Sequence, residues 1–154
     1  MRDIQLESKN FHVDSVGWKQ HTNHQGVIYL QNPEKDIWEY VGRVPRLLVG
    51  HQLFTWFAGM RETEKVGKRM PTDEEWNIVT NNGKDLLNLK KVLPGYRTTD
   101  GTFGNLGMCA HFWSFSVSAC LPVWRRYLNS GSTTVFRYPL VQEHGFSVRC
   151  RFVV

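Results

Sequence analysis

The sequence predicts an α+β fold. A β-rich hairpin pattern comes first, two helical patterns follow it, and a glycine-punctuated series of short β-like segments comes last. Strands and helices segregated along the chain in this way are typical of α+β domains, whereas α/β domains alternate them. The length of 154 residues fits one domain spanning 1–154. We expect strands in 1–49, two helices in 50–91 and loop-rich strands in 92–154.

Residues 27–31 and 37–41 carry the hairpin pattern. Both segments are rich in β-branched and aromatic side chains, and the sequence NPEKD between them is made of turn residues. Gly42 and Pro45 follow the second segment and close the pattern. We therefore expect two antiparallel strands joined by a short turn.

The first helix is predicted over about residues 52–66. Leu53, Trp56 and Met60 recur there at helical spacing. Gly67 follows them, and glycine readily adopts the left-handed backbone that ends many helices. The helix is therefore expected to stop just before Gly67.

The second helix has a sharper start signal at Thr72. Glu75 stands three residues later, so each of these side chains can accept a hydrogen bond from the other residue's free backbone N–H. Asp73 adds negative charge to the first turn, where the helix dipole favours it. The sequence NNG at 81–83 ends the helix, and residues 84–91 are predicted to form one more short helix.

Four short β-like segments follow Pro94. In the last of them Phe146, Val148 and Cys150 alternate with other residues, so we expect Cys150 to be a small buried side chain. Gly145 precedes that segment, and a positive φ is expected there. The four segments cover residues 111–118, 124–128, 133–141 and 146–154.

Composition and the two ends of the chain set further expectations. A content of 41% hydrophobic residues can form a core, and no segment approaches the ~18 consecutive apolar residues of a membrane helix. We therefore expect no membrane span. The first ten residues lack the basic and apolar segments of a signal peptide, which predicts cytoplasmic synthesis and leaves display on a cell or virion surface open.

The net charge of +5 lies in the C-terminal part of the chain. After residue 90 only Asp100 and Glu143 oppose seven basic residues. A basic region can indicate a nucleic-acid partner. Here the basic residues are nearly all arginines placed between aromatic residues, and such arginines often stack or pair within a fold. Nucleic acid is therefore the less favoured partner.

No motif for catalysis or metal binding stands out. His21 and His24 lack a third ligand nearby, and acidic residues are too few in the C-terminal part for a calcium site. Cys109, Cys120 and Cys150 are odd in number and widely spaced, so they predict no disulfide framework. We expect no catalytic residues, no metal and no cofactor.

Four segments together resemble the Fibrobacter succinogenes major paralogous domain, a branch of the formylglycine-generating-enzyme-like C-type lectin folds. They are GKRMPTDEEW at 67–76, PGYR at 94–97, FWS at 112–114 and GFSVRC at 145–150. The resemblance runs over about residues 50–152. It implies a C-type lectin fold with two helices, short antiparallel strands and long glycine-rich loops.

Within that family the chain is similar to the variable proteins of diversity-generating retroelements. Those proteins end in a similar frame of fixed residues, which here are Trp113, Trp124, Gly145, Phe146 and Arg149. We call these five the scaffold residues. Trp113 and Trp124 are expected to be apolar anchors, and Arg149 is expected to stack on an aromatic ring or to cap loop carbonyls.

The resemblance implies a variable region within 111–152, diversified at adenines of Asn codons. Such codons never yield Trp, Met, Lys, Gln or Glu, and none of these types stands at the candidate positions. Apolar residues with proline in a glycine-rich region also suit a binding surface better than a strand. The candidate positions are Phe115, Val117, Ala119, Cys120, Leu121, Pro122, Tyr127, Phe136, Tyr138, Pro139, Leu140 and Val141.

These observations predict a non-enzymatic receptor that binds a protein or cell-surface ligand. Aromatic and apolar side chains at the candidate positions would supply the anchors, with Arg125, Arg126 and Arg137 at the rim. Two alternatives stay open. One is a paralogous-domain protein with a structural or surface role and no diversification. The other is an enzyme of the formylglycine-generating type, although the cysteines here do not form that type's close pair.

Overall fold

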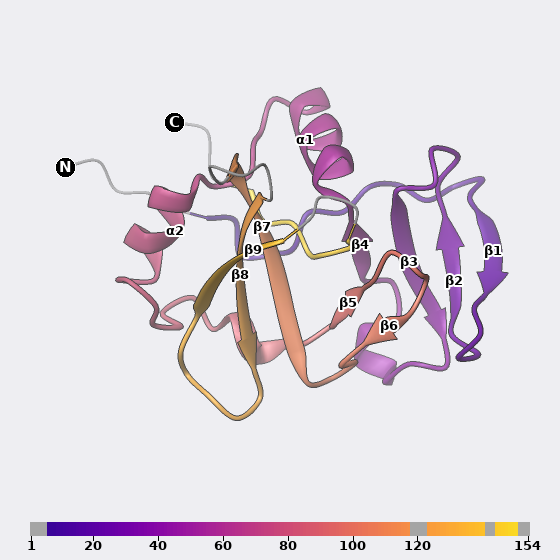
Figure 1. Cartoon of the computed structure of the whole chain (residues 1–154). Helices are drawn as coiled ribbons and strands as arrows, with labels where there is room; N and C mark the ends of the chain where they lie inside the picture. The colour runs from indigo at the N-terminus through magenta and orange to yellow at the C-terminus, as the bar shows by residue number, and fades with distance from the viewer. Residues whose placement is uncertain (1–5, 118–122, 141–143, 151–154) are drawn as a thin grey trace.

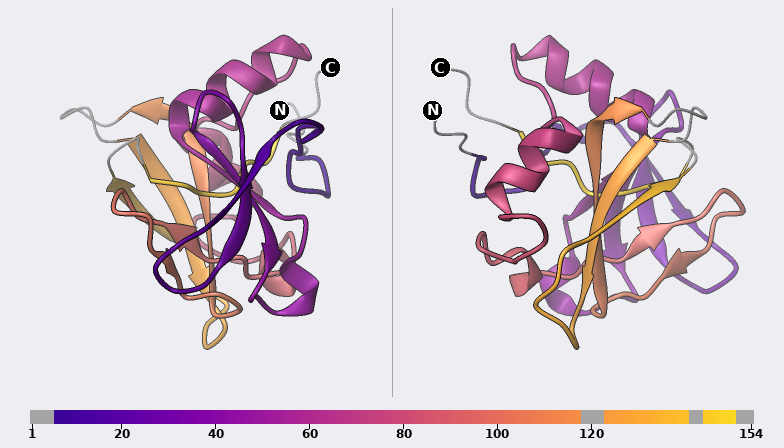
Figure 2. Two further views of the ribbon diagram at one scale, coloured as in Figure 1. Left: turned by 90° about the vertical axis from the view of Figure 1, so that its right-hand side faces the viewer. Right: turned by 60° about the vertical axis from the view of Figure 1, so that its left-hand side comes forward.

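The computed structural model describes residues 6–117, 123–140 and 144–150, and the fold is α+β as predicted (Figure 1). The described residues form three antiparallel sheets, ordered β1-β2-β3-β4, β5-β6 and β7-β8-β9. Figure 2 turns first the β1–β4 sheet and then the β7–β9 sheet toward the viewer. The elements are β1 Lys19–Thr22, β2 Ile28–Gln31, β3 Ile37–Gly42, β4 Gln52–Phe54, α1 Trp56–Lys65, α2 Asp73–Val79, β5 Tyr96–Arg97, β6 Phe103–Gly104, β7 Cys109–Val117, β8 Val123–Asn129 and β9 Phe136–Leu140, with 3-10 helices η1 Arg46–Leu48 and η2 Leu89–Lys91.

The predicted hairpin is confirmed as β2 and β3, which pair antiparallel across the turn at residues 32–36. Asn32 organises this turn, because its side-chain oxygen accepts hydrogen bonds from the backbone N–H groups of Asp36 and Ile37. The sequence did not indicate β1. Its residues KQHT are all exposed at the sheet edge, so they lack the apolar alternation that marks a half-buried strand.

The first helix begins later than predicted. Residues 52–54 form β4, which pairs with β3, and α1 starts only at Trp56 behind the N-cap Thr55. Leu53 therefore packs as a strand residue although its spacing fits a helix. The predicted stop is confirmed. Gly67 has φ +70°, and Gly67 N–H and Lys68 N–H donate to the carbonyls of Glu64 and Thr63, a Schellman end.

The predicted capping box at α2 is confirmed. Glu75 N–H donates to Thr72 Oγ1 at 3.1 Å, and Thr72 N–H donates to Glu75 Oε1 at 2.9 Å. The third helix predicted over 84–91 is wrong except for the short 3-10 helix at its end. Asn88 has a left-handed backbone with φ 55°, which interrupts any longer helix.

The last predicted strand, over 146–154, is mostly wrong for residues 146–150, and residues 151–154 lie outside the described residues. Residues 145–147 make only isolated bridges, to Arg97, Phe54 and Phe112, and residues 148–150 join no ladder. This segment runs between the two larger sheets and bonds to each of them, so it cannot align with one neighbour (Figure 1). Phe146 shows the arrangement, since its N–H and C=O both bond to Phe54, at 2.9 and 2.7 Å.

The core consists of three clusters of buried side chains. Trp76 and Phe112 centre the cluster under α2, Trp113 and Phe146 centre the second, and Trp38 belongs to the third. Two of these indole groups are also bonded to the backbone, because Trp113 Nε1 donates to Phe54 O at 2.6 Å and Trp76 Nε1 to Trp113 O at 3.2 Å. Trp38 Nε1 has no partner among the described residues. β7 thus lies between the first two clusters, because Phe112 belongs to one and Trp113 to the other. Cys150 is buried as predicted.

Gly145 does not have the positive φ that the sequence suggested. The reason for glycine here is space. A Cβ atom at this position would lie 3.0 Å from the Trp38 ring and 3.1 Å from Arg97 Cβ, both tighter than ordinary contact. The Arg97 guanidinium in turn lies 4.0 Å from the Trp38 ring centroid. Gly145 therefore lets the chain pass close to this stacked pair.

Within the described residues, neither helix is long and apolar enough to cross a membrane.

Candidate binding surface

The β7–β9 sheet has two faces with different surroundings. The register places His111, Tyr127 and Phe136 side by side across the three strands, and Trp113, Arg125 and Tyr138 in the next row. Because side chains alternate along a strand, these two rows share one face. The opposite face carries Phe112, Arg126 and Leu128, and α2 lies over it (Figure 2).

On the face under α2, Arg126 corrects the sequence prediction. It was expected at the rim of a binding surface, but it is only 1% exposed. Its guanidinium pairs with Asp73 at 2.7 Å and donates to Asn77 Oδ1 at 2.9 Å. Burial lowers the pKa of Arg126, and the bonds to Asp73 oppose that effect. Arg126 is therefore a buried ion-pair residue that fastens α2 to the sheet.

Arg137 lies at the outer edge of the same face, beside α2, and not at the rim of the aromatic surface where the sequence prediction placed it. It pairs with Asp73 at 2.6 Å, and its guanidinium lies 3.5 Å from the Trp124 ring centroid. Trp124 is only half-buried, so it is not the core anchor that the sequence suggested. The neighbouring strand residue, Pro139, is exposed. The Trp124 ring is therefore covered by the Arg137 side chain and not by core residues.

The other face presents stacked aromatic rings to solvent. The Tyr127 ring centroid lies 5.0 Å from Phe136, 5.7 Å from Tyr138 and 5.1 Å from the His111 ring. Tyr138 is 48% exposed, while Tyr127 and Phe136 are half-buried. We call Tyr127, Phe136, Tyr138 and Arg125 the aromatic face.

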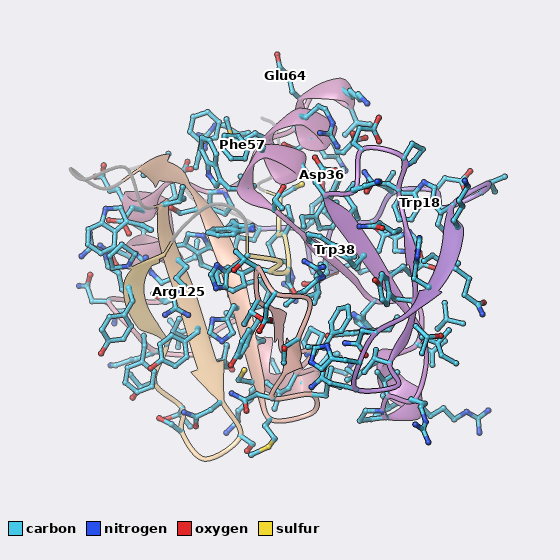
Figure 3. All side chains as sticks on the ribbon, turned by 45° about the vertical axis from the view of Figure 1, so that its right-hand side comes forward. Trp18, Asp36, Trp38, Phe57, Glu64 and Arg125 are labelled. Carbon is cyan, nitrogen blue, oxygen red and sulfur yellow. The ribbon has the colours of Figure 1, made fainter. Side chains whose placement is uncertain are left out.

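Arg125 is the only charged member of the aromatic face (Figure 3 labels it). Its Nη1 lies 2.6 Å from His111 Nδ1, and its guanidinium lies 5.2 Å from the Tyr127 ring centroid. No carboxylate of the described residues pairs with it, and its buried Nε has no hydrogen-bond partner among them. Arg125 is thus held by rings and not by an acid.

His111 is neutral at physiological pH. Burial, and next the charge of Arg125, lower the pKa of His111 to about 3. Because Arg125 donates to Nδ1, the ring proton is assigned to Nε2. Burial also lowers the pKa of Arg125. The pair therefore carries one positive charge, and that charge belongs to Arg125.

A cavity of about 430 Å³ adjoins the aromatic face. His111, Arg125, Tyr127 and Phe146 form its aromatic and cationic part, and polar side chains complete the lining. It is a concave, mainly aromatic site with one cation that has no acidic partner among the residues described. Such a site can bind a ligand through stacking and through one charged contact. The polar lining consists of Thr98, Asn105 and Asn129, together with Tyr96, Cys109 and His144.

The structure brings only part of the predicted variable set together. Phe115 is 38% exposed, but Arg69 lies over its ring at 5.5 Å and its N–H donates to Pro71, so its contacts are with the loop before α2. The backbones of Val117 and Leu140 lie in β7 and β9, while their side chains fall outside the description. Five predicted positions lie outside the described residues: Ala119, Cys120, Leu121, Pro122 and Val141.

Most of the predicted scaffold residues are buried. Trp113 and Phe146 are fully enclosed, and Gly145 is buried between Trp38 and Arg97. Arg149 acts in both ways that the sequence suggested. It lies 5.8 Å from the Phe112 ring centroid and donates to Asn10 Oδ1 at 2.7 Å and to Glu7 O at 3.2 Å.

Sequence reasoning missed His111 and Tyr96, which stand next to Arg125 and Tyr127 in the cavity. The signal for His111 was present, because in a strand His111 faces the same side of the sheet as Trp113 and the opposite side from Phe112. Tyr96 gave no such signal. It comes from the separate β5-β6 sheet and reaches His111 only through tertiary packing, at 5.0 Å between rings.

Metal binding and thiol chemistry find little support in the described residues. Residues 6–117, 123–140 and 144–150 contain no group of three His, Cys, Asp or Glu side chains arranged to hold a metal ion. Burial raises the pKa of Cys109 to about 11 and that of Cys150 to about 12, so both stay protonated thiols at neutral pH.

No family model, no curated protein sequence and no solved structure matches this chain. Function is therefore inferred from the chemistry of the surface.

Proposed function

We propose that this chain is a non-enzymatic binding module of C-type lectin fold whose aromatic face recognises a protein or cell-surface ligand. One observation carries the proposal. Among candidate positions with described side chains, Phe115, Tyr127, Phe136, Tyr138 and Pro139 are all exposed or half-buried. The scaffold residues Trp113, Gly145 and Phe146 are buried.

The C-type lectin fold is proposed from the resemblance together with the architecture. Two helices, short antiparallel strands and long irregular connections agree with it. The segment at 145–147 agrees as well, because the GFS sequence of the resemblance is the one that links the two larger sheets. These features support the assignment, and a comparison of backbones with an experimental structure of this chain would test it.

The composition of the aromatic face suits protein recognition. Tyrosine and arginine are over-represented among residues that dominate binding energy. A tyrosine ring buries much area with only two torsions to fix, and an arginine guanidinium can stack on such rings. The stacking of Tyr127 on His111, Phe136 and Tyr138 restricts these rings before any ligand arrives. Restriction before binding lowers the entropic cost of association.

We also propose that a retroelement diversifies this surface. Phe136 and Tyr138 alternate on β9 with the pairing residue Arg137, so substitutions at the two aromatic positions leave the ion pair to Asp73 intact. The DNA around the coding sequence tests this point. A near-copy of the segment for residues 111–152 that differs at adenines, beside a reverse transcriptase gene, is expected. Its absence would favour the non-diversified surface protein.

The enzyme alternative receives less support. Formylglycine-generating chemistry needs a reactive cysteine pair. Cys109 lies in the cavity beside the aromatic face, whereas the Cys150 carbonyl lies by the N-terminal segment and accepts a hydrogen bond from the Glu7 backbone N–H at 2.8 Å. Their raised pKa values oppose thiolate formation. Mass spectrometry of a cysteine-containing peptide incubated with the protein tests this alternative, and conversion of that cysteine would establish it.

Two matched libraries test the binding-module proposal directly. The first randomises the aromatic face, Tyr127, Phe136, Tyr138 and Arg125, and the second randomises four buried residues. Both are displayed on cells and sorted for protease resistance, which reports folding. We expect most clones of the first library and few of the second to survive, and we expect the first to yield binders to an unrelated protein. Equal losses in both libraries would contradict the proposal. The four buried positions are Trp76, Phe112, Trp113 and Phe146.

A further inference from the structure

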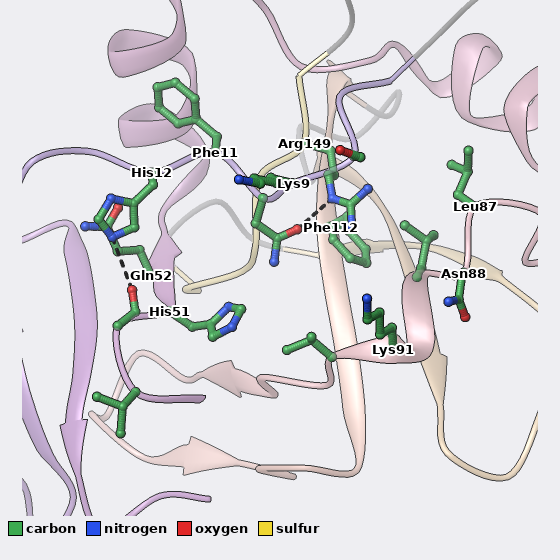
Figure 4. Close-up of a pocket in the computed structure, with 16 residues that line it drawn as sticks. Lys9, Phe11, His12, His51, Gln52, Leu87, Asn88, Lys91, Phe112 and Arg149 are labelled. Atoms are coloured by element: carbon green, nitrogen blue, oxygen red, sulfur yellow. Dashed lines mark hydrogen bonds between the residues drawn. The ribbon is translucent and has the colours of Figure 1, made fainter. Parts of the chain in front are cut away.

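A second cavity, of about 600 Å³, lies away from the aromatic face and shares no lining residue with it. The N-terminal segment around Lys9, the end of β4 and the 3-10 helix η2 surround it, and Phe112 of β7 contributes to the lining (Figure 4). We call it the basic cavity, because lysine and arginine side chains line it and no Asp or Glu does.

The lining of the basic cavity has one sign of charge. Lys9, Lys91 and Arg149 are three cations, and no Asp or Glu belongs to the lining. Two acids act from outside the lining. Glu39 lies 3.3 Å from His12 Nε2, and burial lowers the pKa of Arg149 while the Asp85 carboxylate partly offsets that effect. Cations that share a cavity repel one another, and an anion between them removes that repulsion.

Arg149 is the least solvated of these cations. It is half-buried, and its Nε and Nη1 donate to Asn10 and to the Glu7 carbonyl, which fix the guanidinium plane. Among the described residues its Nη2 has no hydrogen-bond acceptor. A fixed guanidinium with a free N–H edge is well suited to an oxyanion. In Figure 4 Lys91 extends from η2 toward the side where Phe112 and Arg149 lie.

The rest of the lining is suited to an apolar group. Phe112 lies under the Arg149 guanidinium at 5.8 Å, and Phe11, Leu89 and Val92 add apolar surface. His51 also lines the cavity, and burial followed by the charge of His12 lowers its pKa, so it is neutral at physiological pH. The cavity thus combines an apolar wall with a group of cations.

We propose that the basic cavity binds an organic oxyanion, a carboxylate or phosphate carried on an apolar body. The oxyanion lies among Lys9, Lys91 and Arg149, and the apolar body contacts Phe112. The site uses no residue of the aromatic face, so it stands independently of the proposed receptor function.

Isothermal titration calorimetry of the full chain with phenyl phosphate, benzoate, inorganic phosphate and phenol tests the proposal. We expect saturable binding of phenyl phosphate or benzoate with one site per chain, about tenfold tighter than inorganic phosphate or phenol. The aromatic anion with the higher affinity shows whether the site prefers a phosphate or a carboxylate. Raising the salt concentration should weaken the binding, because the cations are close to solvent.

Charge-removing variants locate the site. Lys91→Gln should weaken binding of the aromatic anion about tenfold, and Lys9→Gln should also weaken it. Lys90→Gln, on the same 3-10 helix but outside the lining, should leave it unchanged. Thermal melts verify that all three variants fold. Binding that is unaffected by Lys91→Gln, or no saturable binding of either aromatic anion, would overturn the proposal. Equal affinity for inorganic phosphate would reduce the site to an adventitious ion only.

Discussion

Arg125 and Arg126 are neighbours on β8, yet they face opposite sides of one sheet and have opposite surroundings. Arg126 is buried under α2, where Asp73 and Asn77 bond its guanidinium. Arg125 lies on the aromatic face, where rings and the neutral His111 surround it and no described carboxylate pairs with it. The same side chain therefore serves the fold on one face and is free for a ligand on the other.

The difference shows how a small sheet can be rigid and still offer a binding surface. On the side of α2 the Arg126 side chain bonds to Asp73 and Asn77 of the helix, so a change there disturbs two elements at once. On the aromatic face Phe136 and Tyr138 contact Tyr127 at the surface, and Tyr127 and Arg125 also contact the buried His111. Substitutions should accordingly be costly on one face and mild on the other.

The largest loss of stability is expected at Trp113, on the same side of the sheet as the aromatic face. Trp113 shares the row of Arg125, but it is fully buried against Phe146 and its indole bonds to Phe54. Trp113→Ala should lower the free energy of unfolding by ~3–5 kcal/mol, a large part of the ~5–15 kcal/mol of a typical domain. Urea denaturation measures this. Phe115→Ala, two residues along the strand, is the exposed control and should cost far less.

The next largest loss of stability is expected when Asp73, the first residue of α2, loses its charge. Asp73→Asn leaves Arg126 buried without its counter-charge and should cost about 3 kcal/mol in chemical denaturation. Glu74→Gln is the matched control, because Glu74 is the next helix residue and is exposed. If the two variants were equally stable, the buried ion pair would not be what holds α2 to the sheet.

The same carboxyl predicts a pH dependence. Burial would raise the pKa of Asp73, but the hydrogen bonds and charges of Arg137 and Arg126 outweigh it, so the pKa is lowered. A carboxyl of this kind contributes stability that is fully present above its unfolded pKa of about 3.9 and is lost as the pH falls through its folded pKa. The stability difference between the protein and Asp73→Asn should stay constant between neutral pH and about pH 5 and shrink below about pH 4. A difference that persists at acid pH would contradict this.

The two arginines can be compared by the same substitution. Arg126→Met leaves Asp73 with Arg137 alone and removes the bond to Asn77, so about 2 kcal/mol of stability should be lost. Arg125→Met keeps an apolar body among the rings and breaks no ion pair with a described residue, so stability should change by less than about 1 kcal/mol. Thermal and urea unfolding of both variants decide the comparison, and a greater loss for Arg125→Met would reverse it.

The sequence predicted those features whose causes are local. The capping box of Thr72 with Glu75 and the stop at Gly67 depend on residues within a few positions of each other. Leu53 was wrongly placed in a helix, because its spacing suits a helix while pairing with Trp38 of β3 decides for a strand. Helical spacing carries no information about a strand partner that lies elsewhere in the sequence.

The candidate site was predictable only in outline. Alternation placed Tyr127, Phe136 and Tyr138 on β-rich segments, but the register that stacks them on His111 is a tertiary fact. The burial of Arg126 was missed because its partners on α2 are about fifty positions away in the chain. The local sequence around an isolated strand arginine is the same whether or not an acidic side chain lies beside it in the fold.

One variant tests the central claim, that the exposed and half-buried candidate positions are dispensable for folding. It replaces Phe115, Phe136, Tyr138 and Pro139 with asparagine, and its reference is the double variant Trp113→Asn and Phe146→Asn. We expect the fourfold variant to unfold cooperatively in urea with a loss of no more than about 2 kcal/mol, since each surface change costs within about 0.5 kcal/mol. The reference variant should be unfolded. If the fourfold variant shows no cooperative transition, its four side chains belong to the core, and these candidate positions do not form a surface free to vary for binding.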